Sequence, residues 1–244
     1  MTSGIYSLVS GMSARWQKQD SHSTNISGAS AIGQKRLMTT FSSFQKALQD
    51  AQQPSSGTSF QSPSVSAQTP AFDWSPGRMK LTGESLDVAI QGPGFFQVQT
   101  PNGTSLTRDG HFKLDSSNRL VTSQGHPVLG ESGPITFSSR DVNIKSDGTL
   151  TAKGQNAGRL KLVMPERLNQ LKSEDGTYFS SGAAKLVRAS SATLAPNYLE
   201  ESNVDLPREM VGMIQNQRMS DMLSRAVQAQ DESYGKAIQE LGSI

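Results

Sequence analysis

The apolar residues near the end of the chain recur at the spacing of an α-helix. From residue 205 to residue 241 they follow an i, i+3, i+4, i+7 pattern with a polar gap at Gln217 and Ser220. Asp205 suits the N-cap, and Pro207 suits the first turn, where a missing N–H costs nothing. The apolar positions are Met210, Met213, Ile214, Leu223, Val227, Tyr234, Ile238 and Leu241.

Such a helix would span roughly 55 Å, at about 1.5 Å per residue. It cannot bury its apolar stripe inside a compact domain of roughly 13 Å radius. We therefore expect it to pack against the N-terminal helix and against copies of itself. A core helix of a large all-α domain is the alternative interpretation.

A second amphipathic helix is predicted from Ser3 to about Ser30. Its second half is rich in Ser, Thr and Asn, which are weak helix formers, so the helix needs a partner. Gly28 and Gly33 bracket its end. The apolar residues of its first half are Ile5, Leu8, Val9, Met12 and Trp16.

Two interpretations remain open for residues 34–48, which could form a strand or a short helix. From Gln52 to Gly77 the composition changes, with Pro interleaved among Ser, Gln and Thr. This composition alone is typical of a flexible linker. Four apolar residues instead favour an extended segment that lies along a surface, namely Phe60, Val65, Phe72 and Trp74.

The sequence pattern predicts β-structure for residues 80–195. Short apolar runs recur every 8–12 residues between Gly-containing turns, which is typical of an antiparallel sandwich or barrel. Gly92-Pro93-Gly94 separates two of these runs and is predicted to close a hairpin. The predicted strands include Phe112-Lys113-Leu114, Arg119-Leu120-Val121, Val142-Asn143-Ile144, Leu150-Thr151-Ala152 and residues 159–163.

These patterns predict an α+β fold. Long N- and C-terminal helices would pair as a coiled-coil-like terminal domain, with a mainly antiparallel β domain between them. The predicted domains are residues 1–36 with 199–244, a connecting segment at 37–79, and a β domain at 80–198.

Composition narrows the function classes. The net charge of +2 is too small to argue for nucleic acid or an anionic membrane, and the absence of Cys removes disulfides and thiolate metal sites. Residues 1–50 carry five basic and two acidic groups, net +3, whereas residues 199–244 carry four basic and eight acidic groups, net −4. Opposite signs favour association of the two ends. No signal-peptide pattern is recognised, so we expect any exit from the cytoplasm to use another route.

No catalytic constellation is found in the sequence. Gly92-Pro93-Gly94 begins like a phosphate-binding loop but precedes a strand, where that loop needs a helix. Residues 141–152 resemble a calcium loop but have Ser146 and Ala152 where the loop needs Gly and an acid. None of the three histidines has a metal-ligand type at useful spacing. We expect no enzyme activity, no cofactor and no metal.

Several motifs, spread in order over nearly the whole chain, resemble the flagellar hook–basal-body rod proteins. Length and opening are most similar to the proximal-rod members of that family, with the distal-rod members next. The motifs are Gly4-Ile5-Tyr6-Ser7, Gly33-Gln34-Lys35-Arg36, Leu86-Asp87-Val88-Ala89-Ile90-Gln91-Gly92-Pro93-Gly94-Phe95-Phe96, Thr107-Arg108-Asp109-Gly110-His111-Phe112, and Leu199-Glu200-Glu201-Ser202-Asn203-Val204-Asp205.

The resemblance implies a structural subunit of the basal-body rod, a rigid helical polymer that transmits torque through the periplasm. The implied partners are copies of itself, other rod and hook proteins, and the flagellar type III export apparatus, with no nucleic acid and no small-molecule substrate. The expected subunit-interface residues are Ile5, Leu8, Met12, Asn25, Gly33, Leu199, Asn203, Met210, Met213, Ile214, Leu223, Val227 and Ile238.

A secreted carbohydrate- or surface-binding β module with helical oligomerisation ends is the alternative function. It would need exposed aromatic residues on the β domain, and both tryptophans, Trp16 and Trp74, lie outside that domain.

Overall fold

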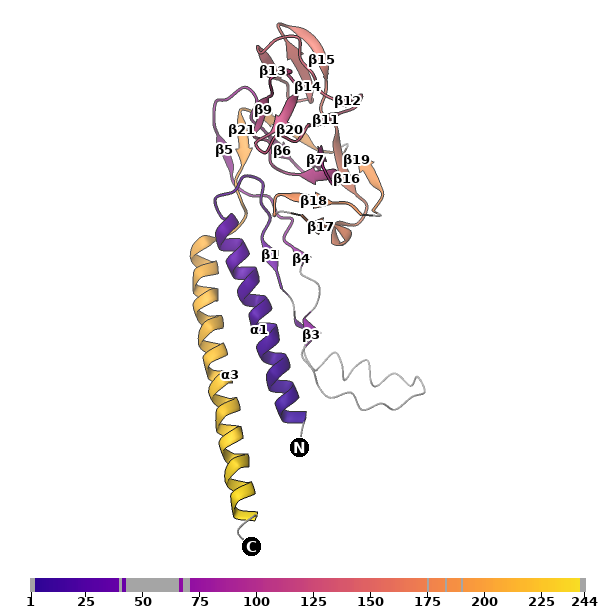
Figure 1. Ribbon diagram of the computed structural model, residues 1–244. Helices are drawn as coiled ribbons and strands as arrows, with labels where there is room; N and C mark the ends of the chain where they lie inside the picture. The colour runs from indigo at the N-terminus through magenta and orange to yellow at the C-terminus, as the bar shows by residue number, and fades with distance from the viewer. Residues whose placement is uncertain are drawn as a thin grey trace. The chain divides into compact units, whose positions relative to one another are not determined.

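The computed structural model describes residues 3–39, 41–42, 66–67, 71–174, 176–182, 184–189 and 191–241 (Figure 1). The chain forms two compact units. Unit 1 comprises residues 1–26, 37–71 and 205–244, and unit 2 comprises residues 27–36 and 72–204. Much of the predicted connecting segment at 37–79, including residues 40 and 43–48 of the undecided stretch at 34–48, lies outside the described residues. Among the described helices, none is long and apolar enough to cross a membrane.

Unit 1 is built on two long helices, α1 (Ser3–Gly28) and α3 (Leu206–Leu241). The predicted N-cap of α3 is confirmed, because Asp205 Oδ1 accepts a hydrogen bond from the Arg208 N–H at 3.2 Å. Four two-residue strands also occur, of which β2 and β3 pair antiparallel. These strands are β1 (Leu37–Met38), β2 (Phe41–Ser42), β3 (Ser66–Ala67) and β4 (Ala71–Phe72).

The predicted α+β fold with coiled-coil-like paired helices is wrong. The described residues hold two α-helices in a fold that is otherwise mostly β-strand, and no long coiled coil joins those helices. Antiparallel α1 and α3 lie side by side (Figure 1) and contact one another through polar groups. Among the α3 residues whose burial the structure describes, the buried or half-buried ones are Glu209, Gly212, Met213, Asn216, Ser220, Leu223, Ser224, Val227 and Gln230.

The predicted coiled coil does not form because polar residues occupy the inner face of α3, the face turned toward α1. A coiled coil requires apolar side chains at successive a and d positions. Here Glu209 and Asn216 are buried on that face, whereas Met210 and Ile214, which the helical pattern selected, are more than half exposed. Spacing identified an apolar stripe correctly, but it did not tell which neighbour the stripe would meet.

Unit 2 is a set of antiparallel sheets, as predicted, and the largest has the order β17-β18-β8-β7-β16-β19. Its strands are β5 (Met79–Leu81), β6 (Val88–Gln91), β7 (Phe95–Thr100), β8 (Gly103–Thr107), β9 (Phe112–Leu114), β10 (Leu120–Thr122), β11 (Leu129–Gly130), β12 (Gly133–Pro134), β13 (Val142–Ile144), β14 (Thr149–Ala152), β15 (Gln155–Arg159), β16 (Leu162–Pro165), β17 (Lys172–Ser173), β18 (Tyr178–Ser180), β19 (Leu186–Arg188), β20 (Thr193–Pro196) and β21 (Tyr198–Glu200), and a 3-10 turn spans Leu168–Gln170.

Both faces of the six-stranded sheet are covered. Phe96 and Val98 of β7 belong to the larger apolar core, whereas Phe95 points into a second cluster on the other face. Phe72 and Trp74 pack against that second cluster, with Trp74 edge-on to Phe95 at a ring separation of 5.4 Å. The extended segment around Trp74 therefore does lie along a surface, that of the sheet.

The prediction of a hairpin at Gly92-Pro93-Gly94 is wrong. β6 pairs with β20, whereas β7 pairs with β8 and β16, so this turn carries the chain from one sheet to another. Both glycines have positive φ, 101° at Gly92 and 155° at Gly94. A Cβ on Gly94 would lie 3.0 Å from Ala189 Cβ, so the turn requires glycine for space as well as for conformation.

Candidate assembly site

Three motifs that are far apart in the sequence meet at Glu200. This residue ends β21 and is 1% exposed. Its Oε1 accepts hydrogen bonds from Lys35 Nζ at 2.6 Å and from the Gly77 N–H at 2.9 Å. Its Oε2 accepts one from Arg108 Nη1 at 3.1 Å. A single carboxylate thus joins the segment after α1, the segment before β5 and the loop after β8.

The two cations of this cluster are held by further contacts. Lys35 Nζ also donates to the Ser75 carbonyl at 2.8 Å, and burial lowers the pKa of Lys35 while the Glu200 carboxylate acts in the opposite direction. Arg108 donates to the Gly92 carbonyl at 2.9 Å, and its guanidinium lies 5.3 Å from the centre of the Phe95 ring. Two buried cations therefore share one buried anion, an arrangement in which losing the anion is costly.

Gly33 and Asn203, two of the predicted interface residues, belong to the same region. The Gly33 N–H donates to the Glu200 carbonyl at 2.7 Å, and a Cβ at its φ of +69° would lie 2.5 Å from the Arg108 carbonyl carbon. Asn203 Oδ1 accepts from the Arg36 N–H at 2.7 Å. Its Nδ2 donates to the Asp73 carbonyl at 2.8 Å. Both residues therefore position segments of their own chain.

Leu199 and Asn25 are likewise buried within the chain. Leu199 packs in unit 2 as part of β21. Asn25, in unit 1, bonds the backbone of Leu37 in both directions, accepting from its N–H at 2.7 Å and donating to its carbonyl at 2.9 Å. The structure thus gives these residues contacts inside the subunit, and their part in a subunit interface stays a prediction.

The other predicted interface residues lie on the helices. Met210 and Ile214 are exposed, whereas Met12, Met213, Leu223 and Val227 are half-buried. The side chains of Ile5, Leu8 and Ile238 lie outside the described residues. The list therefore mixes two faces of α3, one turned toward α1 and one turned away from it.

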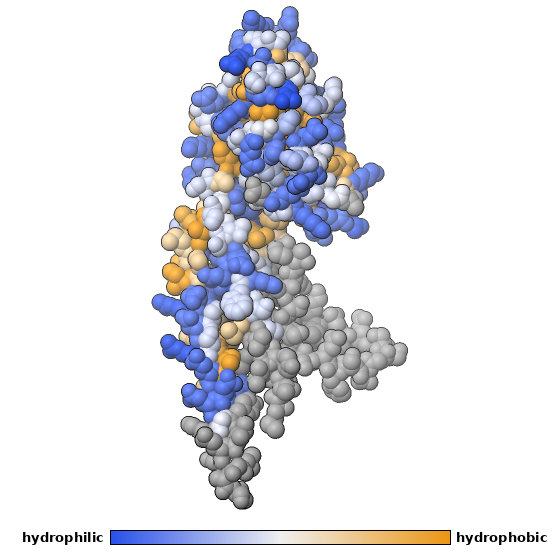
Figure 2. Space-filling view, in the orientation of Figure 1, coloured by the Kyte–Doolittle hydropathy of each residue, from blue (hydrophilic) through white to orange (hydrophobic). Residues whose placement is uncertain are grey.

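An exposed apolar face occupies the first turns of α3. Leu206, Met210 and Ile214 follow one another at four-residue spacing, and Val211 lies beside them, at 40%, 52%, 54% and 54% exposure. Figure 2 shows this face as an orange area over the start of α3. The predicted apolar pattern did not include Leu206 or Val211, although the i, i+4, i+8 spacing of Leu206, Met210 and Ile214 indicates the first of them. Contiguous exposed apolar residues of this kind are typical of a protein–protein contact.

The described residues offer little for catalysis. They contain no group of three or more His, Asp or Glu side chains that could hold a metal ion. Sequence reasoning did miss two histidine–carboxylate pairs, His111 with Asp87 at 2.7 Å and His22 with Glu209 at 2.5 Å. Each pairs one histidine with one carboxylate, across segments that are distant in sequence.

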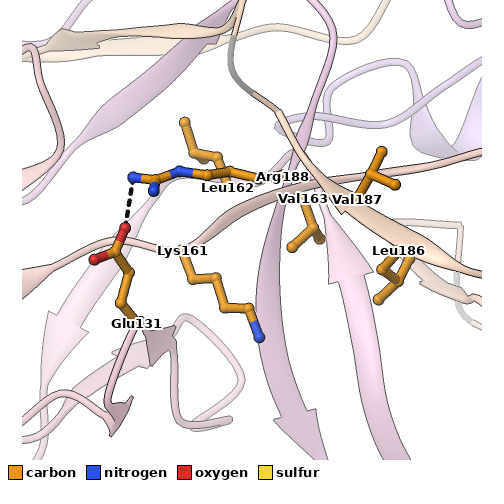
Figure 3. Close-up of a pocket in the computed structure, with 7 residues that line it drawn as sticks. All are labelled: Glu131, Lys161, Leu162, Val163, Leu186, Val187 and Arg188. Atoms are coloured by element: carbon orange, nitrogen blue, oxygen red, sulfur yellow. Dashed lines mark hydrogen bonds and ion pairs between the residues drawn. The ribbon is translucent and has the colours of Figure 1, made fainter.

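A pocket of about 280 Å³ lies beside β16 and β19 (Figure 3). Leu162, Val163 and Leu186 line it, and Arg188 binds Glu131 at 2.6 Å along its edge, which satisfies both charges. Ligand pockets usually measure about 300–1,000 Å³ and enclose most of the ligand. This pocket is small and its charged groups are largely exposed, so it is a poor candidate for a substrate site.

An exposed apolar helix face of this kind is typical of proteins that bind other proteins. Comparison with known proteins gives the family. A model of the flagellar hook protein FlgE/F/G D1 domain matches residues 89–152, and a model of the flagellar basal body rod FlgEFG protein C-terminal region matches residues 195–240.

Full-length relatives agree with these matches. The flagellar basal-body rod protein FlgF of Salmonella typhimurium is 32% identical over 99% of each chain, and that of Escherichia coli is 31% identical over 99% of each. The flagellar basal-body rod protein FlgG of Bacillus subtilis is 29% identical over 95% of this chain and 96% of its own. The chain belongs to the flagellar basal-body rod protein family, so the resemblance inferred from the sequence motifs is confirmed.

Proposed function

We propose that this protein is a structural subunit of the flagellar basal-body rod. It polymerises with copies of itself and with other rod and hook proteins into an axial shaft that transmits torque across the periplasm. Family membership supports the location in the basal body. The observation that carries the mode of assembly is the exposed apolar face formed by Leu206, Met210, Val211 and Ile214.

The size of this face favours many contacts over one. Burying a large apolar side chain stabilises an interface by about 1.5–3 kcal/mol when the side chain starts fully exposed, and these four start about half exposed. Association costs an estimated 4–15 kcal/mol in lost translational and rotational freedom. The free energy gained by burying one such face therefore roughly equals the cost of association. A polymer in which each subunit contacts several neighbours gains more than this cost and is stable.

We assign the remaining predicted interface residues to the same assembly in two roles. Ile5, Leu8, Met12 and the α3 residues Met213, Leu223, Val227 and Ile238 would complete the helical contacts. Asn25, Gly33, Leu199 and Asn203 would act indirectly, by fixing the segments that flank the helices. Residues 1–36 and 199–244 would thus form the assembly domain, 37–79 the connecting segment and 80–198 the outer β domain.

We also propose export by the flagellar type III apparatus, without a cleaved signal peptide, and a final position in the part of the rod that spans the periplasm. Family membership supports both. We assign no enzymatic activity, cofactor, nucleic acid or small-molecule substrate.

The substitution Ile214→Asp tests the apolar face. Because Ile214 is 54% exposed in the free chain, the variant should fold as the wild type does, with unchanged thermal unfolding. In the polymer the new charge would be buried without a partner, which costs several kcal/mol and should abolish rod assembly and motility.

Gln228→Asp is the matched control, since it adds the same charge to an exposed position on the same side of α3, outside the apolar face. It should keep near-normal motility. Wild-type motility in the Ile214→Asp strain would contradict the proposed contact. Equal loss in both variants would show that the whole side of the helix, rather than its first turns, is in contact.

A further inference from the structure

Gly212 interrupts α3 at a position where glycine weakens a helix by about 1 kcal/mol relative to alanine. The imidazole of His22, on α1, occupies the space where a side chain would lie. A Cβ built on Gly212 would be 2.7 Å from His22 Cε1 and 3.1 Å from its Nε2. Contacts below about 3.0 Å essentially never occur, so any other residue at this position would push the ring away. The glycine provides a notch in α3 that receives the ring.

The ring is also held from one side. His22 Nδ1 lies 2.5 Å from Glu209 Oε2, and the side chains are 12% and 1% exposed. Glu209 precedes Gly212 by three residues, so the carboxylate and the notch are neighbours on the same face of α3. The contact with Glu209 and the limited space at Gly212 therefore fix the position of the His22 ring both along the axis of α3 and around it.

The His22–Glu209 pair lowers the stability of the helix contact, and a role in specificity would explain why it is present. His22 Nε2 is buried and has no hydrogen-bond partner among the described residues. Leaving a buried polar atom unsatisfied is unfavourable, and an apolar contact would avoid that cost. Buried polar side chains between helices are known to be retained where they specify one register.

The sequence of α3 admits the ring at one place only. The other glycine of α3, Gly235, lies 23 residues further along, or roughly 35 Å at about 1.5 Å per residue. A slip of one turn, about 5.4 Å, would bring His22 against Arg208 or Asn216 instead. A second set of contacts agrees with the observed register, since Asn216 Nδ2 donates to the Arg15 carbonyl at 2.9 Å and to Gln19 Oε1 at 3.0 Å.

We propose that His22, Glu209 and Gly212 form a socket that determines the axial register of α1 on α3. His22 is the register-determining residue and Gly212 its receptor. The socket directs the polar face of α3 toward α1, which leaves Met210 and Ile214 on the outside. This role concerns the folded subunit, so it stands or falls independently of rod assembly.

The sequence contains no cysteine, so engineered pairs of cysteines can report the register directly. The pair Gln19→Cys/Asn216→Cys joins two positions that touch in the observed register. The pair Gln19→Cys/Ser220→Cys would meet after a slip of one turn. The measured quantity is the ratio of the initial rates at which the two disulfides form in a glutathione redox buffer, read by mass spectrometry. We expect the first pair to form about tenfold faster or more, since a clash in a packed contact typically changes the preference by that factor.

Gly212→Ala should reduce this ratio about tenfold by expelling the ring. Gly235→Ala is the matched control, because its Cβ meets nothing within 4 Å, and it should leave the ratio unchanged. In the double variant His22→Ala/Gly212→Ala the new Cβ enters the space of the lost ring. The absolute rate of the 19–216 pair should then recover relative to Gly212→Ala alone.

Any one of four results would overturn the socket. The ratio would be unaffected by Gly212→Ala, it would fall equally with Gly235→Ala, or the double variant would cross-link more slowly than Gly212→Ala alone. Absence of the 19–216 disulfide in the otherwise wild-type chain would also overturn it, since α1 would then not lie against α3 in this register. Circular dichroism of every variant distinguishes a shifted register from loss of the helices.

Discussion

In unit 2 two clusters of buried apolar residues cover both faces of the six-stranded sheet, and the buried cations Lys35 and Arg108 both pair with Glu200. In unit 1 the apolar residues at the start of α3 are outside, while the contact between the helices contains His22, Glu209 and Asn216. Unit 2 is therefore stabilised by contacts among residues of its own chain. Unit 1 has polar groups between its helices and an exposed apolar face on α3, which we propose contacts other subunits.

The largest expected loss of stability in unit 2 follows from removing the carboxylate of Glu200. Glu200→Ala leaves Lys35 and Arg108 buried without an anion, and removing one partner of a buried ion pair typically costs about 3–5 kcal/mol. We expect a comparable fall in the free energy of unfolding, measured by urea denaturation of the full-length chain followed by tryptophan fluorescence. Glu201→Ala, at the next residue, removes no ion pair among the described residues and should have little effect. A similar stability for both variants would show that the cluster at Glu200 is dispensable.

Hydrogen exchange on the free monomer compares the two units without mutation. We expect the amides of α1 and α3 to exchange roughly 100-fold faster than those of β7 and β8, a difference of about 2.7 kcal/mol in opening free energy. The physical reason is that a helix with a polar inner face offsets less of its ordering entropy than a strand that is buried on both faces. Protection of α3 equal to that of β7 would mean that α3 is as stable as the sheet before assembly.

The smallest expected effect concerns Asp109, which lies beside β9. Burial raises the pKa of Asp109, and the hydrogen bond from the His111 N–H opposes that shift. A raised pKa in the folded state stabilises the protein below the ordinary carboxyl pKa, and this contribution is lost as the pH rises through the raised value. We therefore expect the free energy of unfolding of the wild type, minus that of Asp109→Asn, to fall as the pH rises across that window.

Subtracting the variant removes the contributions of Asp73, Asp115 and Asp147, whose pKa values are lowered by hydrogen bonds and which therefore act in the opposite direction. A difference curve that is flat with pH would show that Asp109 titrates as it does in the unfolded chain.

The sequence alone determined the elements, since these depend on local patterns. The helix after Asp205 follows from apolar spacing, a cap and a first-turn proline, and strands such as Phe112–Leu114 and Val142–Ile144 follow from turn signals. The family motifs were equally local, which is why the family could be recognised from them.

Only the tertiary structure decided what those elements face. Periodicity places Ile214 and Asn216 on different sides of α3, but it does not state which side α1 will cover. The predicted apolar stripe therefore includes both half-buried residues, such as Met213, and exposed ones, such as Ile214. In the same way, Gly92-Pro93-Gly94 signalled a turn, while the pairing of β6 with β20 decided that it joins two sheets. The convergence of Lys35, Arg108 and Glu200 was beyond reach for the same physical reason. Local propensity acts within a few residues, whereas burial of a charge depends on partners 92 and 165 residues away in the chain.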